Sequence, residues 1–151
     1  MIELNWQYSN FYELSAEDLY TILKLRSEVF VVEQNCAYLD MDDKDQDSFH
    51  LSGWDGNQLV AYARILPPGL AFDEASIGRV VTNPRYRKTG SGRVLMAHAI
   101  EKTLAQFMVA EIKIGAQLYL LAFYTSLGFK QSGPEYLEDG IPHVEMSLSK
   151  N

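Results

Sequence analysis

The chain has 151 residues, of which 47% are hydrophobic and 22% charged; this is an ordinary globular composition and predicts one domain over residues 1–151. Its 20 acidic side chains outnumber the 13 basic ones, and the formal net charge of -7 argues against nucleic acid as a partner. We expect a cytoplasmic protein with no membrane partner, because the sequence has no signal-peptide pattern, no membrane-length apolar run and a single cysteine.

The first part of the chain alternates strand and helix patterns. Residues 2–8 alternate apolar and polar side chains, which is the period of a half-buried strand. Ser15, followed three residues later by an aspartate, indicates the start of a helix that we expect to end near residues 32–34. Residues 48–66 contain two strand-like runs around an Asp-Gly turn and predict a β-hairpin.

Residues 40–47 form the most acidic segment of the chain. A calcium-binding loop does not fit, because Ser48 occupies the position of the required glycine and Trp54 that of the bidentate glutamate. We therefore expect a solvated loop at the substrate entrance, which would favour a positively charged amine as substrate.

The next stretch, residues 75–96, reverses the sign of the charge. It contains no acidic residue but five basic ones, and reads as a β-branched strand, a basic loop with Gly90 and Gly92, and a helix. A helix start carries unpaired N–H groups and the positive end of the helix dipole, and glycines let a ligand approach the backbone closely. We interpret this stretch as a cradle for a pyrophosphate.

The C-terminal part adds a strand at 111–116, a helix at 118–127 that ends at Gly128, and a final strand around 144–148. The order of elements predicts an α/β (α+β mixed) fold, with a mixed central β-sheet and helices on both faces.

Two local motifs identify the ligand of the cradle. Residues 90–95 carry a leucine in place of the third glycine of a dinucleotide fingerprint, and the chain has no P-loop sequence. The segment Arg87–Gly92 instead reads R-x-x-G-x-G and resembles the acetyl-coenzyme A signature of the GNAT N-acetyltransferase superfamily. Residues 123–129, Phe-Tyr-Thr-Ser-Leu-Gly-Phe, resemble its helix-to-strand segment, and residues 26–34, 116–117 and 136–143 resemble its ElaA-like branch.

This resemblance implies a GNAT domain in which splayed strands hold acetyl-CoA as cosubstrate, with no metal. The residues that it places on coenzyme A are Val80, Val81, Thr82, Arg87, Lys88, Thr89, Gly90, Ser91, Gly92, Arg93, Gln117 and Tyr124. The backbone of the strand would pair with the pantetheine arm and polarise the thioester carbonyl, and the loop amides would bind the pyrophosphate.

The resemblance also implies that Tyr124 is the general acid that protonates the departing thiolate. A phenol with a pKa of about 10 is protonated at neutral pH and can donate. The general base is less defined by the sequence: Glu33, His143 and Glu145 are candidates, and a water relay would need none of them.

We therefore expect an acetyl-CoA-dependent N-acetyltransferase that transfers the acetyl group directly to a small-molecule or peptide amine; the resemblance is also compatible with a homodimer. Two alternatives stay open. One is a non-catalytic acyl-CoA-binding sensor or partner subunit, and the other is an enzyme of the same fold that uses a longer acyl group or a hydroxyl acceptor.

Overall fold

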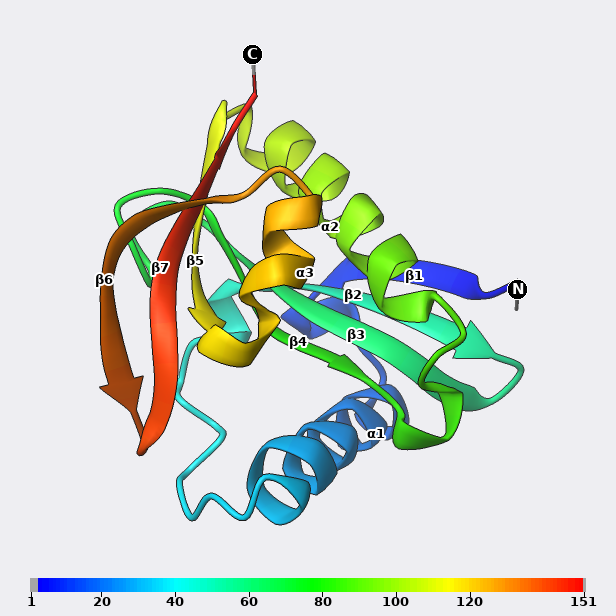
Figure 1. Cartoon of the computed structure of the whole chain (residues 1–151). Helices are drawn as coiled ribbons and strands as arrows, with labels where there is room; N and C mark the ends of the chain where they lie inside the picture. Colours follow the sequence, from blue (N-terminus) through cyan, green and yellow to red (C-terminus); the bar gives the residue numbers. More distant parts are fainter. Residues whose placement is uncertain (1–2, 151) are drawn as a thin grey trace.

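The computed structural model describes residues 3–150 (Figure 1). The strands are β1 (Asn5–Asn10), β2 (Phe49–Asp55), β3 (Gln58–Leu66), β4 (Ser76–Thr82), β5 (Glu111–Gln117), β6 (Lys130–Glu138) and β7 (Ile141–Ser149). The helices are α1 (Ala16–Arg26), which continues as a π-helical segment (Ser27–Glu33), α2 (Ser91–Phe107) and α3 (Leu121–Ser126). Within residues 3–150, no helix is both long enough and apolar enough to cross a bilayer.

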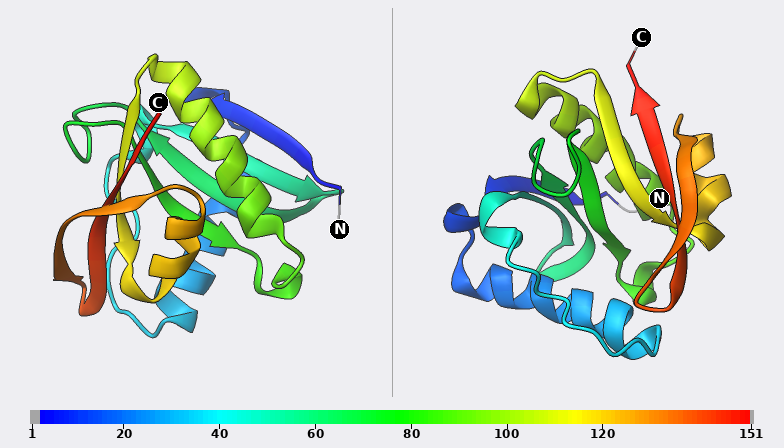
Figure 2. Two further views of the ribbon diagram at one scale, coloured as in Figure 1. Left: turned by 45° about the horizontal axis from the view of Figure 1, so that its top comes forward. Right: turned by 90° about the vertical axis from the view of Figure 1, so that its left-hand side faces the viewer.

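The strands form two antiparallel sheets, ordered β1-β2-β3-β4 and β5-β7-β6. The sheets are joined at one end, where Ala75 and Ile112 form a parallel bridge and the Lys113 N–H donates to the Ala75 carbonyl at 3.0 Å. Beyond this bridge the structure pairs no residues of β4 with β5 over the described part of the chain, and the two strands diverge (Figures 1 and 2). A β4–β5 pair that opens after one bridge is the main feature that positions the site.

Helices cover both faces of the first sheet (Figure 2). On one face, Ile22 and Leu25 of α1 pack with Tyr62 of β3, and on the other face Ala61 and Ala63 belong to the larger core that includes α2. The alternation along β3 follows from the two-residue period of a strand. Burial of a side chain such as Ile22, which is fully inaccessible, stabilises the fold by about 1.5–3 kcal/mol.

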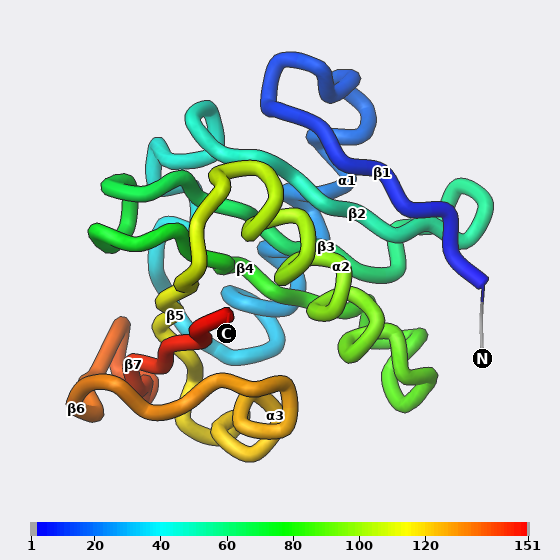
Figure 3. The backbone as a smooth tube through the Cα atoms, turned by 90° about the horizontal axis from the view of Figure 1, so that it is seen from above, coloured from blue at the N-terminus to red at the C-terminus, as the bar shows by residue number. Residues whose placement is uncertain are grey.

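The second sheet lies with α3 on one side of the molecule, away from β1 and the N-terminus (Figure 3). Tyr124 of α3 contacts Phe129 edge to face with ring centroids 5.9 Å apart, and both side chains are buried in the larger core. Edge-to-face packing of this kind is a favoured geometry for aromatic rings. It fixes α3 beside the opening between β4 and β5.

Most expected elements are confirmed. Ser15 caps α1, since its hydroxyl accepts from the Asp18 N–H at 3.0 Å, and residues 48–66 are the β2–β3 hairpin. The strand expected at 2–8 is β1, although residue 2 lies outside the described residues. The helix expected at 118–127 starts with a 3-10 turn, becomes α3 at Leu121, and ends at Gly128, whose φ of 104° suits glycine.

The expectation of a solvated acidic loop at 40–47 is wrong. Asp40 and Asp45 are each only 6% exposed, and three arginines neutralise the buried carboxylates of this segment. Burial of unpaired carboxylates would be very costly, so the loop folds inward only because cations from α1, β3 and β4 meet it.

Candidate active site

A cleft of about 1130 Å³ opens where β4 and β5 diverge. One wall is formed by β4 over its full length, residues 76–82, together with residues 38–44 of the loop after the π-helical segment. The facing wall is formed by side chains of β5, β6, β7 and α3. The cleft therefore runs between the two sheets and reaches residues from both ends of the chain.

The β4 strand offers a free edge to this cleft. Its other edge pairs with β3, and the register between the two strands shifts around Arg79, whose φ is 50°. Positive φ is uncommon for a residue other than glycine and marks a bulge that re-aims the strand. Backbone groups of a free edge need hydrogen-bond partners, and an extended ligand with amide groups can supply them as an added strand would.

A second cavity of about 340 Å³ lies at the Thr82 end of β4, over the N-terminus of α2. Gly90 caps this helix with φ at 84°, and no side chain caps the helix, so the first N–H groups of α2 face outward. A Cβ at position 92 would lie 3.7 Å from the Thr82 methyl, an ordinary contact that leaves the approach open. Free amides, a dipole and open space suit a pyrophosphate, so the group that the sequence predicts here fits.

The side chains of this loop have distinct local roles. The Thr89 hydroxyl is 2.6 Å from both the Tyr86 carbonyl and the Ser91 hydroxyl, which holds the loop against the helix start. Arg93 donates to the Ser126 hydroxyl at 2.9 Å and lies over the Phe123 ring, so its guanidinium is held against α3. Lys88 and Arg85 remain exposed.

Two long-range contacts connect the π-helical segment to the cleft. Arg87 forms an ion pair with Glu33, and both side chains are about half exposed. The side-chain amides of Gln34 and Gln117 pair reciprocally, at 3.1 and 3.3 Å. Glu33 is thus held on the cradle side of the cleft by a residue that sequence reasoning places on coenzyme A.

Tyr124 lines the cleft from α3 and is 5% exposed. Burial is the main reason that the pKa of its hydroxyl lies well above the ordinary value for tyrosine, and the electrostatic effect of the neighbouring Tyr119 raises this pKa further. The hydroxyl has no hydrogen-bond partner among residues 3–150 and stays protonated over the whole physiological range. It is therefore a proton donor whose donor capacity is unused.

The β6–β7 hairpin supplies the polar part of the second wall. His143 is 6% exposed, its Nδ1–H donates to the Ile141 carbonyl at 2.7 Å, and its ring stacks on Tyr136. Gly115 of β5 makes room for Tyr136, because a Cβ there would overlap the phenol oxygen. Glu145 is half-buried in the cleft and has no ion-pair partner among the described residues.

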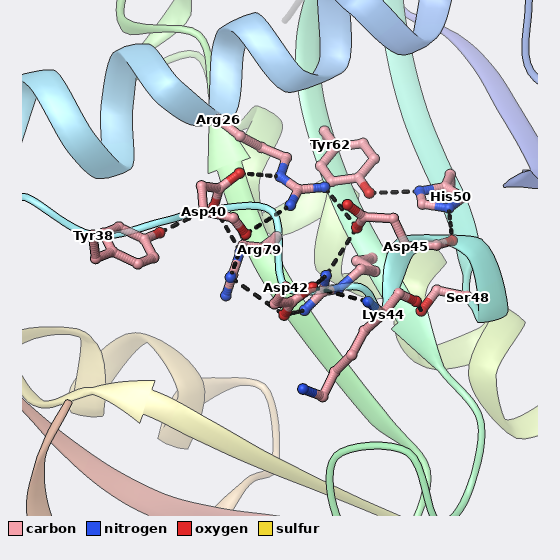
Figure 4. Close-up of polar contacts among 11 residues, drawn as sticks. Arg26, Tyr38, Asp40, Asp42, Lys44, Asp45, Ser48, His50, Tyr62 and Arg79 are labelled. Atoms are coloured by element: carbon pink, nitrogen blue, oxygen red, sulfur yellow. Dashed lines mark hydrogen bonds and ion pairs between the residues drawn. The ribbon is translucent and has the colours of Figure 1, made fainter. Parts of the chain in front are cut away.

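The first wall rests on a group that we call the arginine–aspartate network (Figure 4). It consists of Arg26, Arg64, Arg79, Asp40, Asp42 and Asp45. Arg26 is fully buried and donates from Nε to Asp40 and from Nη1 to Asp45, each at 2.8 Å. Arg64 binds Asp42 through two nitrogens, each at 2.7 Å, and also reaches Asp45 at 2.8 Å. Arg79 connects β4 to the arginine–aspartate network, since its Nη2 donates to the Asp40 carbonyl at 2.8 Å.

The arginines of the network keep the Asp42 carboxylate ionised. Burial alone would raise the pKa of Asp42, but the hydrogen bonds and charge of Arg64 outweigh burial and hold that pKa well below its usual range. His50 closes the network on one side: Nε2 lies 2.9 Å from the Asp45 carbonyl, which can only accept, so this nitrogen carries the proton and Nδ1 accepts from the Tyr62 hydroxyl at 2.6 Å. Burial lowers the pKa of His50 and keeps it neutral.

Most residues predicted from the sequence line these two cavities. Those that do are Glu33, Val80, Val81, Thr82, Arg87, Lys88, Gly90, Ser91, Gly92, Arg93, Gln117, Tyr124, His143 and Glu145. Thr89 does not line either cavity. Sequence reasoning missed Lys44, Arg64 and Tyr136 as lining residues; Lys44 and Tyr136 lie in segments already singled out, at 40–47 and 136–143, whereas no local pattern marks Arg64.

The family model described as an acetyltransferase (GNAT) domain matches residues 13–150, so the chain belongs to the GNAT acetyltransferase family. Within it, the chain is similar to the protein ElaA of Escherichia coli, at 41% identity over 146 residues and 95% of both chains. The crystal structure of E. coli ElaA has a TM-score of 0.90 at 40% identity, covering 97% of this chain and 100% of that one. An acyl-CoA N-acyltransferase from Pseudomonas aeruginosa has a TM-score of 0.92 at 38% identity with the same coverage.

These comparisons confirm the resemblance seen in the sequence, including its ElaA-like branch, and confirm the fold. The chain is an acyltransferase of the GNAT type, and acyl-CoA is the cosubstrate that this fold binds.

Proposed function

We propose that this chain is an acetyl-CoA-dependent N-acetyltransferase that transfers the acetyl group directly to an amine. The observation that carries the proposal is the hydroxyl of the buried Tyr124, a residue that lines the same cleft as the free edge of β4; this hydroxyl has no hydrogen-bond partner within residues 3–150. The description of the family as acetyltransferases supports acetyl as the transferred group.

The donor would lie along β4 with its pyrophosphate at the start of α2. Backbone amides from Gly90 to Arg93 would bind the phosphate oxygens, and the exposed Lys88 adds positive charge. The edge of β4 from Val80 to Thr82 would pair with the amides of the pantetheine arm. An N–H of this edge would then polarise the thioester carbonyl, because a fixed donor stabilises the oxyanion that develops there.

The chemical step forms one C–N bond and breaks one C–S bond. The neutral amine attacks the thioester carbonyl carbon, and the tetrahedral intermediate expels the coenzyme A thiolate. Tyr124 protonates this thiolate and recovers its own proton from solvent. The raised pKa of Tyr124 keeps the donor protonated before the reaction.

The proton that the amine loses would go to Glu145, directly or through a water molecule. Of the base candidates, Glu145 is half-buried and unpaired in the described structure, whereas Glu33 is ion-paired with Arg87 and the Nε2 of His143 lies 3.5 Å from the Glu138 carboxylate. Glu33 is thereby better suited to a role on the donor side of the cleft than to proton transfer.

The alternative of a non-catalytic acyl-CoA sensor predicts binding without turnover. The test is release of free thiol from acetyl-CoA in the presence of a panel of amines, with formation of the acetylated amine followed by mass spectrometry. Amine-dependent release with one amide per thiol is expected. Tight acetyl-CoA binding without release for any amine would overturn the proposal, and faster transfer from propionyl- or butyryl-CoA would replace acetyl by a longer group.

We also propose a cytoplasmic location and a homodimer, which cell fractionation and sedimentation analysis test directly. The single cysteine, Cys36, which is buried and unpaired, supports a reducing compartment.

A further inference from the structure

The cleft extends beyond the part that a thioester would fill. The cradle and residues 80–82 occupy one end, and the cleft continues past residues 76–79 of β4 to Lys44 and Arg64 on one wall and to Tyr136 and Glu145 on the other. An acceptor that meets the thioester from the side opposite coenzyme A would lie in this second part. We call the loop 38–45 with Arg64 and Arg79 the acceptor wall.

The charges of the acceptor wall do not favour a polycation. Three arginines and three aspartates form the arginine–aspartate network, so the network itself is neutral, and its carboxylates are already bound by guanidinium groups. In addition, the Nε of Arg64 is buried without a hydrogen-bond partner among residues 3–150, so the wall has a surplus of donors. An acidic stretch of sequence thus presents no free negative charge to the acceptor.

Among the residues of this wall that line the cleft, Lys44 is the one whose charge has no ion-pair partner within residues 3–150. It is half-buried, it lines the cleft, and its ammonium group makes no ion pair with any described residue. Figure 4 shows the side chain leaving the network and pointing toward the side of β5. On the facing wall, the half-buried carboxylate without an ion-pair partner in the described structure is Glu145. Among their half-buried side chains, the two walls therefore present one cation and one anion without an ion-pair partner in residues 3–150; Asp139, which also lines the cleft without an ion-pair partner, is exposed.

The backbone of Lys44 is held in place although its ammonium group is free. Its N–H donates to Asp42 at 3.2 Å, and its carbonyl accepts from the Ser48 hydroxyl at 2.6 Å. Asp42 is in turn fixed by Arg64, so the network acts as a rigid base for the lysine. A preorganised base lowers the cost of ordering a binding side chain.

We propose that the acceptor is a small amine that also carries an anionic group, a carboxylate or a phosphate, and that Lys44 binds this group. The amine would face Glu145 and the anion Lys44, so that the two half-buried charges without an ion-pair partner are matched. This inference rests on the proposed function, because it takes the second part of the cleft as the acceptor site. Lys44 then determines specificity and takes no part in the chemistry.

The test uses pairs of amines that differ in the anion: β-alanine against n-propylamine for a carboxylate, and phosphoethanolamine against ethanolamine for a phosphate. Putrescine represents the cationic amine. We expect wild-type kcat/KM to favour the anionic member of at least one pair tenfold or more, since a charge-assisted hydrogen bond contributes about that factor or more. The pair that shows the preference identifies the anion.

Three variants locate this preference. Lys44→Gln should lower kcat/KM for the anionic amine at least tenfold, chiefly through KM, and for its neutral partner less than threefold. Lys44→Arg should retain most of the preference. Lys24→Gln, at an exposed lysine of α1, changes the net charge equally and should have no effect. Equal losses for both members of a pair, or a wild-type preference for putrescine, would overturn the inference.

Binding measured without turnover separates this inference from the proposed function. Protein-observed NMR titration with β-alanine and phosphoethanolamine, in the presence of free coenzyme A, reports the acceptor site directly. If no amine releases thiol, the proposed function fails, but saturable binding that Lys44→Gln weakens tenfold would still support the anion site. Absence of such binding in the wild type would overturn it.

Discussion

The proposed cradle would bind through the backbone of consecutive residues, whereas the acceptor wall holds its side chains by ion pairs between residues 14 to 39 positions apart in the sequence. In the cradle, glycines and a helix start present amide groups whose direction is set by the main chain. In the acceptor wall, direction is set by six buried or half-buried charges that must all be present together. A backbone site tolerates many side-chain changes, while a charge network does not, and the following experiments measure this difference.

The largest effect is expected at Asp45, whose carboxylate contacts two arginines. Asp45→Asn keeps the shape but leaves Arg26 and Arg64 short of a negative charge in a buried place, which should lower the free energy of unfolding by about 3–5 kcal/mol. Urea denaturation measures it. Asp43→Asn, at an exposed neighbour, should change stability by less than about 0.5 kcal/mol.

The stability difference between wild type and Asp45→Asn should also depend on pH, and the direction of this dependence follows from the pKa of Asp45. The pKa of Asp45 is lowered in the folded protein: burial opposes this, but the hydrogen bonds and charges of Arg26 and Arg64 outweigh it. Its contribution is therefore complete above the unfolded-state pKa of about 4 and is lost as the pH falls through the folded-state pKa. The stability difference between wild type and Asp45→Asn should shrink below about pH 4, and a constant difference would mean that the carboxylate is not the cause.

The second largest effect is expected for Tyr124→Phe. This variant tests the proposed chemical step, in which donor and acceptor react. Loss of a general acid should lower kcat by about a hundredfold or more while acetyl-CoA affinity stays within a factor of about three. Steady-state kinetics and calorimetry give the two numbers. Tyr119→Phe provides the control, because Tyr119 also lines the cleft but is 73% exposed. Equal kinetics for the two variants would remove Tyr124 from the reaction.

A backbone change in the cradle comes third. Gly90→Val should weaken acetyl-CoA binding at least tenfold, since φ of 84° disfavours any side chain and a valine would also cover the free amides. Gly56→Val in the β2–β3 turn is a matched control, with φ of 60° and similar open space. Calorimetric titration should show the loss only at position 90, whereas equal affinities would contradict the cradle assignment.

The smallest effect is expected at Glu33, on the boundary between the two regions. Glu33→Gln removes a half-exposed ion pair and should change stability by less than about 1 kcal/mol. Release of Arg87 should tighten acetyl-CoA binding by about twofold to fivefold, because an arginine freed from a carboxylate is available to phosphate. A large drop in kcat with a shifted pH profile would instead make Glu33 the base.

The sequence was informative where local rules decide the structure. The capping Ser15, the Asp-Gly turn of the hairpin, Gly128 at the end of α3 and the strand–loop–helix at 75–96 each follow from residues within a few positions of one another. Most of the proposed donor site could be inferred for the same reason, since residues 80–93 are one continuous segment; Gln117 and Tyr124 lie further along the chain.

The acceptor wall was not predictable, because its partners are far apart in the sequence. Five aspartates within eight residues indicate a solvated loop, because the sequence alone does not show that Arg26, Arg64 and Arg79 lie beside them in the fold. Only the three-dimensional structure shows that the neighbouring arginines and aspartates form ion pairs with one another and that Lys44 is left without one among the described residues. Local composition thus did not reveal that the carboxylates of this segment are paired with arginines.

Arg79 belongs to both regions, since its backbone lies in β4 beside Val80 and its guanidinium lies in the arginine–aspartate network. For protein engineering this has a practical consequence. A loop 36–48 transplanted from a relative with another acceptor would bring new carboxylates to three fixed guanidinium groups, one of them on β4, the strand proposed to hold the thioester. Positions 26, 64 and 79 therefore have to be exchanged together with the loop. On the proposal made for Lys44, a single substitution at that position would change the acceptor preference without disturbing the network.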